Sequence, residues 1–179
     1  MRSGVLKMLK KILTFFIAIN ALFGAEISES NLQDLIKKCN EKDKIACGEV
    51  SRFYGKSTKK SRFLDAESMK LWVDYALKGC ELKDGESCYT IAYHYAKAGV
   101  DSPRFFETDN AKKEAYLIKG CDYRFAQSCY ILGLINYDNF YKKNGDKNKF
   151  KQKSKQFIKK ACDLGFEKAC GENWDLSEK

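Results

Sequence analysis

The sequence is poor in the residues that interrupt regular structure, with a single proline and 12 glycines among 179 residues. So low a content excludes collagen-like and low-complexity chains, which are rich in these residues. The composition, with 44% hydrophobic and 32% charged residues, instead fits one compact globular domain.

Histidine is almost absent as well, since His94 is the only one. A zinc site needs closely spaced cysteines, such as a pair with two residues between them, and usually histidines. We therefore expect no metal and no cofactor, and we expect His94 to lie at the surface or in a groove.

The chain also lacks an apolar run long enough for a membrane anchor. Residues 12–23 form an apolar run of 12 residues, whereas a spanning helix needs about 20. Four basic residues precede this run: Arg2, Lys7, Lys10 and Lys11. With Gly24 and Ala25 after it, the pattern is typical of a signal peptide. We expect cleavage after residues 1–25, export of residues 26–179 to the periplasm or the medium, and no stable membrane anchor.

Positive charge is in excess, but part of it belongs to the expected signal peptide. Removing residues 1–25 lowers the net charge from +9 to +5. The lysine-rich stretch at residues 142–160 favours a solvated helix face, with an anionic polymer or membrane surface as the alternative. Export argues against a nucleic-acid partner.

Eight cysteines form four pairs with a fixed spacing. The pairs are Cys39 and Cys47, Cys80 and Cys88, Cys121 and Cys129, and Cys162 and Cys170. Seven residues separate the members of each pair, and each pair follows the previous one after 41 residues. A period near 40 is typical of a solenoid, in which each unit is one supersecondary motif stacked on its neighbours.

In an oxidising compartment, an even set of regularly spaced cysteines indicates a disulfide framework. Eight cysteines allow 105 pairings, but in a repeat protein each unit must form its disulfide from its own cysteines. We therefore expect each cysteine to pair with its partner inside the unit.

Helical spacing of apolar residues predicts an all-α solenoid of four helical hairpins, at about residues 30–55, 65–99, 109–138 and 150–175. Residues 55–61, 100–106 and 138–148 are expected to be loops. Four core positions lie one helical turn before the first cysteine of each unit: Leu35, Ala76, Leu117 and Ile158.

Residues 75–80, 87–92 and 161–170 resemble the Sel-one-like repeat, a relative of the tetratricopeptide repeat. The signal peptide and the paired cysteines narrow the resemblance to the exported cysteine-rich Sel-like proteins called the Hcp family. Members of that family are described as penicillin-binding proteins with β-lactamase activity. The resemblance implies helical hairpins with one disulfide each, and possible binding or hydrolysis of a β-lactam.

Three short segments match the letters of serine β-lactamase motifs: residues 57–60, 137–139 and 143–145. The serine of those enzymes starts a helix that packs on a sheet. Ser57 is instead expected in a lysine-rich loop between hairpins, so coincidence explains the letters better. No catalytic residue is assigned, and β-lactam hydrolysis is kept as the alternative function.

We expect the protein to act as a binding or protein-interaction scaffold; export alone would also suit an effector recognised by host cells. In tetratricopeptide-like folds the first helices of the units supply most of the inner, partner-binding side. Candidate ligand-binding residues there are Lys70, Asp74, Lys112, Lys113 and Lys119. They favour a peptide, protein or cell-wall fragment in the groove. Periodic aromatics are expected mainly to pack between helices, or else to grip such a ligand: Trp72, Tyr75, Tyr89, Tyr93, Tyr95, Tyr116, Tyr130 and Tyr137.

Overall fold

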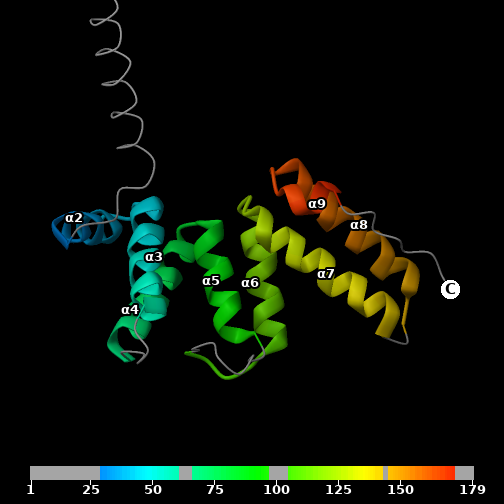
Figure 1. The fold of residues 1–179 in the computed structure, drawn as a ribbon, viewed down its shortest axis with the longest axis horizontal. Helices are drawn as coiled ribbons and strands as arrows, with labels where there is room; N and C mark the ends of the chain where they lie inside the picture. Colours follow the sequence, from blue (N-terminus) through cyan, green and yellow to red (C-terminus); the bar gives the residue numbers. More distant parts are fainter. Residues whose placement is uncertain (1–28, 61–65, 97–104, 143–144, 172–179) are drawn as a thin grey trace, which may run out of the picture. The chain divides into compact units, whose positions relative to one another are not determined.

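The computed structural model describes residues 29–60, 66–96, 105–142 and 145–171, which contain eight α-helices and no strand (Figure 1). The helices are α2 (Glu29–Asn40), α3 (Lys44–Lys60), α4 (Ala66–Glu81), α5 (Gly85–Tyr95), α6 (Asn110–Asp122), α7 (Ala126–Lys142), α8 (Lys147–Asp163) and α9 (Glu167–Gly171). None of these helices has the length and apolarity needed to cross a membrane. The predicted signal peptide and most of the predicted loop at 100–106 lie outside the described residues.

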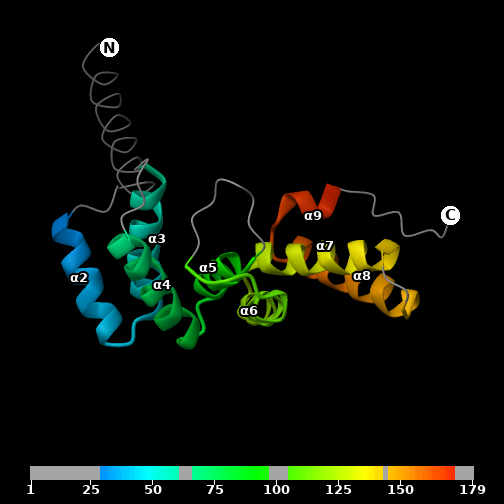
Figure 2. The ribbon, with the colours of Figure 1, turned by 90° about the horizontal axis from the view of Figure 1, so that it is seen from below.

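The chain divides into two units, Met1–Gln33 and Asp34–Lys179. The first unit contributes only the start of α2 to the described residues. In the second unit every helix from α3 to α8 packs against the helix that follows it, as Figures 1 and 2 show most plainly for α7 and α8. This arrangement confirms the predicted all-α solenoid of disulfide-stapled helical hairpins.

One turn geometry joins the two helices of every hairpin. Within the described ranges the residues with positive φ are Lys42, Lys83, Arg124 and Gly165, each 41 positions after the last. The residue that follows each of them donates its N–H to a carbonyl five residues back, for example Asp84 to Gly79 at 2.9 Å. This bond and the left-handed residue define a Schellman motif, which ends the first helix and reverses the chain. The third turn has this shape although it contains no glycine.

Each of these turns is bracketed by a disulfide. The bridges are Cys39–Cys47, Cys80–Cys88, Cys121–Cys129 and Cys162–Cys170, with Cα–Cα distances between 4.6 and 4.9 Å. These are the pairs that the periodicity predicts. Four bridges in so short a chain indicate an oxidising compartment.

The predicted core positions are mostly buried. Ala76, Leu117 and Ile158 are 5% exposed or less, and Leu35 is half-buried. Leu117 and Ile158 join the cysteines of the third bridge in one cluster, while Ala76 packs with Val73 and Ile91. The third bridge is therefore part of the core, and the cysteines of the first two bridges are buried as well.

The prediction of a loop at residues 55–61 is wrong, because α3 continues to Lys60. Gly55 is buried, and a Cβ on it would lie 2.8 Å from Cε2 of Trp72. The helix backbone itself packs against the indole ring at this level. Residue 61 of the predicted loop lies outside the described residues.

The predicted loop at residues 138–148 is too long, since α7 runs to Lys142 and α8 begins at Lys147, which leaves Gly145 and Asp146 as its described non-helical residues. Phe140 is 3% exposed, and an ion pair of 2.7 Å joins Asp138 to Lys142 one turn apart. Conversely, the helix predicted to continue past Tyr95 ends there, because Ala96 has extended backbone angles.

Candidate functional site

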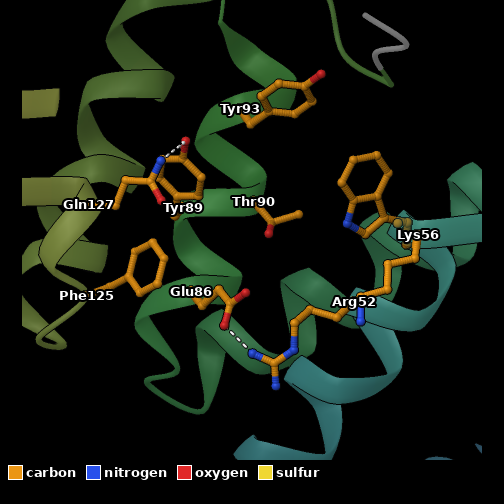
Figure 3. Close-up of a pocket in the computed structure, with 10 residues that line it drawn as sticks. Arg52, Lys56, Glu86, Tyr89, Thr90, Tyr93, Phe125 and Gln127 are labelled. Atoms are coloured by element: carbon orange, nitrogen blue, oxygen red, sulfur yellow. Dashed lines mark hydrogen bonds and ion pairs between the residues drawn. The ribbon is translucent and has the colours of Figure 1, made fainter. Parts of the chain in front are cut away.

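A hollow of about 340 Å³ in the second unit opens on the side of the second helices of the hairpins (Figure 3). On α3 and α4 it is lined by Arg52, Gly55, Lys56 and Trp72. On α5 and the start of the third hairpin's second helix it is lined by Glu86, Tyr89, Thr90, Tyr93, Phe125 and Gln127. We call it the larger hollow.

Charged side chains line one side of the larger hollow. Arg52 of the first hairpin pairs with Glu86 of the second hairpin and with Glu49 on its own helix. Lys56, one turn further along α3, is exposed and forms no ion pair within the described part of the chain. Its ammonium group is therefore available to an anionic ligand, whereas the guanidinium of Arg52 is already neutralised.

Four aromatic rings also line the larger hollow. The rings of Trp72 and Tyr93 lie 6.1 Å apart, and those of Tyr89 and Phe125 lie 5.3 Å apart. Gln127 donates a hydrogen bond of 3.2 Å to the hydroxyl of Tyr89, which fixes the second pair. Figure 3 shows Thr90 between Tyr89, Phe125 and Gln127 on one side and Arg52 and Lys56 on the other. Rings with polar ends beside a cation suit a ligand that is partly apolar and partly anionic.

Burial affects the ionisation of one tyrosine in this lining. Burial first, and the nearby Tyr93 second, raise the pKa of Tyr89 above its usual value. Its phenol is neutral at physiological pH and can both accept the bond from Gln127 and donate to a ligand.

A second, smaller hollow of about 150 Å³ lies beside the first. It is lined by Tyr89, Ala92, Tyr93, Ala96, Lys113, Leu117 and Ile131, so it shares two tyrosines with the larger hollow. Only Lys113 among these residues carries a charge, and its ammonium group donates to Oδ1 of Asn110 at 3.2 Å. The smaller hollow is thus a mostly apolar depression beside one lysine.

The five predicted ligand-binding residues lie on first helices, and only Lys113 lines a described hollow. Lys70 pairs with Asp74 at 2.7 Å, and this carboxylate raises the pKa of Lys70. Lys112 lies 3.7 Å from Asp109, the N-cap residue of α6, and over the ring of Tyr95, while Lys119 lies over the ring of Tyr116. The first-helix groove stays a prediction.

His94 is completely buried, so the prediction of a surface or groove position is wrong. Its ring contacts that of Trp72 edge-on at 4.5 Å, and its Nδ1 accepts a hydrogen bond of 3.3 Å from the backbone of Phe105. The aromatic packing around it gives the histidine a structural role behind the larger hollow. No group of three or more candidate metal ligands occurs among the residues that the structure describes.

Two of the three segments that match β-lactamase motifs lie on helices of different hairpins. Residues 57–60 form the last turn of α3, and Tyr137 to Asn139 lie inside α7. Residues 143–144 lie outside the described ranges. A serine that ends a helix does not have the placement that the serine enzymes require, where it starts one.

Sequence reasoning identified Trp72, Tyr89 and Tyr93 only as members of an aromatic set, and it missed Arg52, Lys56 and Glu86. Glu86 follows Arg52 by 34 residues, so no local motif connects them. An alignment of the repeats at their 41-residue period places Trp72 at the same position as Lys113 and Ser154. A tryptophan at a position that is polar in the other repeats would have marked it as a candidate binding residue.

No protein-family model matches the chain, and no curated protein matches its sequence. The evidence for the fold and for the candidate site is therefore the cysteine period, the disulfides and the geometry described above. What these observations establish is a cysteine-rich helical repeat protein.

Proposed function

We propose that this protein is an exported, disulfide-stapled binding module of the Sel-one-like type, and that its ligand occupies the larger hollow. Its fold and its one disulfide per hairpin are those that the resemblance to the Hcp family leads one to expect. Export through a cleaved signal peptide to the periplasm or the medium is part of the proposal.

The observation that carries the proposal is the lining of the larger hollow. Trp72, Tyr89 and Tyr93 are held there by ring contacts and a hydrogen bond, so they offer contact area without a large entropic cost of ordering. Lys56 adds a charge that the described residues leave unneutralised. Aromatic anchors beside an available cation are typical of binding surfaces.

A photo-crosslinking experiment tests the binding function. We would place a photoreactive amino acid at Thr90, in the middle of the hollow, and at Lys149, an exposed position on α8, in cells that produce the protein. We expect adducts of defined mass from the position of Thr90 only. Equal adducts from both positions, or none from either, would contradict a binding function for this hollow.

Export is tested separately by mass spectrometry of the protein recovered from its compartment. We expect an N-terminus directly after residue 24 or 25, because the residues before that point form the three-part pattern of a signal peptide. Recovery of an intact residue 1 in the exported fraction would contradict cleavage.

β-Lactam hydrolysis stays the alternative, carried by the family resemblance alone. A chromogenic β-lactam incubated with the pure oxidised protein, and with the S57A and K60A variants, tests it. Turnover that both substitutions abolish would establish the alternative; no turnover is expected from the placement of these residues.

A further inference from the structure

The larger and smaller hollows occupy the same position of the repeat in consecutive units. Four residues of the larger hollow, moved forward by 41 positions, coincide with four residues of the smaller one. The matching pairs are Arg52 and Tyr93, Gly55 and Ala96, Trp72 and Lys113, and Thr90 and Ile131. The stacking of the units therefore presents one kind of site twice along the same face.

The two hollows adjoin each other on α5. Tyr89 and Tyr93 line both of them, so the two hollows meet at these residues. A ligand that extends across α5 contacts both hollows at once. This makes an elongated ligand a better fit than two separate small molecules.

The two hollows differ in the chemistry that they offer. The larger one has the exposed ammonium group of Lys56, without an ion pair among the described residues, and the hydroxyl of Thr90 in the same lining. The smaller one has Ala92, Leu117 and Ile131, two of which are at most 2% exposed. An anionic group suits the first and an aliphatic or aromatic side chain suits the second.

We propose that the two hollows form one track for a linear peptide that crosses α5, with an acidic side chain at Lys56 and an apolar side chain in the smaller hollow. This inference rests on the proposed binding function and specifies its ligand class. Charge complementarity at Lys56 is what selects an acidic peptide over a neutral or basic one.

The stacking of the units also sets the spacing of the two side chains in the peptide. Packed helices lie about 8–10 Å apart. A polyproline II helix advances about 9.3 Å in one turn of three residues, which returns its side chains to the same side. We take this spacing for the track, and propose that the acidic and the apolar residue are three positions apart in an extended peptide.

Fluorescence anisotropy with defined synthetic peptides tests the inference. The probes are fluorescein-labelled octapeptides in which one glutamate and one leucine are separated by two, three or four positions, in both orders, with the remaining residues glycine and serine. We expect the three-position peptide of one order to bind about tenfold more tightly than its glutamine counterpart, because a charge-assisted contact is lost. It should also bind more tightly than the peptides with other spacings.

Two variants locate the binding. K56Q should abolish the preference for glutamate over glutamine, whereas K149Q, at an exposed lysine outside both hollows, should leave it unchanged. I131A should weaken binding of the leucine peptide but not binding of a peptide with alanine in place of the leucine. The circular dichroism spectrum of the I131A protein shows whether this variant has folded. A96L, which fills the smaller hollow, tests the same contact independently.

Equal affinity for the glutamate and glutamine peptides, an unchanged preference in K56Q, or no binding of any peptide would overturn the peptide track. If crosslinked adducts still form at Thr90 in those cases, the hollow binds a ligand of another class and the proposed binding function stands. If neither adducts nor peptide binding are found, both are wrong.

Discussion

Glycine and serine residues make the closest helix contacts inside the second and third hairpins. Gly79 and Gly120 occupy equivalent positions just before a bridge cysteine, and a Cβ on either would lie 2.3 Å from the hydroxyl oxygen of Ser87 or Ser128. The fourth hairpin has alanines at both positions. The middle units are therefore packed more tightly at this level than the last one.

We expect G120A to destabilise the oxidised protein by about 1–3 kcal/mol, the usual cost of overpacking. The new methyl group would meet Ser128 and, at 3.0 Å, the backbone oxygen of Gly85, which cannot move aside as a side chain does. Urea denaturation measures the loss. G171A is the matched control, because nothing lies within 4 Å of a Cβ there; an equal effect of both substitutions would contradict the packing argument.

Partly buried tyrosines make the free energy of unfolding depend on pH in the alkaline range. Burial raises the pKa of Tyr89, as it does for Tyr54 and Tyr75. A raised pKa means that the folded state holds the phenol proton more tightly than the unfolded state. The stability that this tighter binding contributes is complete below the pKa of a tyrosine in the unfolded state, about 10. It is lost as the pH rises through the pKa of the tyrosine in the folded state.

We therefore expect the free energy of unfolding to fall above about pH 10, and to fall less steeply in Y89F. At neutral pH, Y89F should cost about 0.5–1.5 kcal/mol, because it removes the acceptor of the hydrogen bond from Gln127. Denaturation curves from pH 7 to 11 measure both effects. Parallel pH profiles of the two proteins would show that Tyr89 does not titrate with folding.

Among the elements, the turn between the helices of each hairpin is the most regular. Lys42, Lys83 and Arg124 have φ between 67° and 69°, and Gly165 has 89°. A left-handed conformation costs a side chain about 1–2 kcal/mol. Three of the four turns therefore carry a conformational cost that the flanking disulfide and the Schellman hydrogen bonds offset.

This regularity predicts opposite effects of substitution at equivalent turn positions. R124G should stabilise the protein by up to about 1 kcal/mol, since glycine adopts positive φ without strain, whereas G165A should destabilise it by a similar amount. Thermal unfolding of the two variants measures the difference. Destabilisation by R124G would show that the arginine side chain contributes more than its backbone conformation costs.

The fourth disulfide differs from the others in its accessibility. All six cysteines of the first three bridges are at most 5% exposed, whereas Cys170 is exposed and Cys162 is half-buried. Thiol–disulfide exchange requires access to a sulfur atom. Helix α9 has only five residues, too few to persist without the covalent link.

We expect the Cys162–Cys170 bridge to be reduced first under mild conditions. Brief treatment with a phosphine reductant, followed by alkylation and mass spectrometry, should label these two cysteines before the other six. In urea all four bridges should react at similar rates, because burial is then removed. Early labelling of Cys88 or Cys129, which are fully buried, would contradict this order.

At the scale of the whole molecule, the sequence was sufficient to predict the architecture. The 41-residue cysteine period determines the number of hairpins and their bridges, since each unit closes its own turn. The ends of the helices were harder to predict. Gly55 packs its backbone on Trp72, and Asp138, Asn139 and Lys142 flank Phe140 in the sequence, so neither helix end shows an apolar period.

The candidate site was less predictable, for a physical reason. Arg52 and Glu86 meet only because two units stack, and their separation in sequence carries no local signature. General tetratricopeptide geometry pointed to the first helices, where Lys70 and Lys112 already have acidic partners. The hollows instead lie on the face to which the second helices contribute most.

The central claim is that this second-helix face, with α5 at its centre, is the binding surface. Two-dimensional NMR of the isotope-labelled, oxidised protein tests it most directly, using the peptide with glutamate and leucine three positions apart as the added ligand. The account predicts amide shift changes at Lys56, Thr90, Tyr93 and Ile131. Changes confined to the surroundings of Lys70, Asp74 and Lys119, or no changes at all, would contradict it.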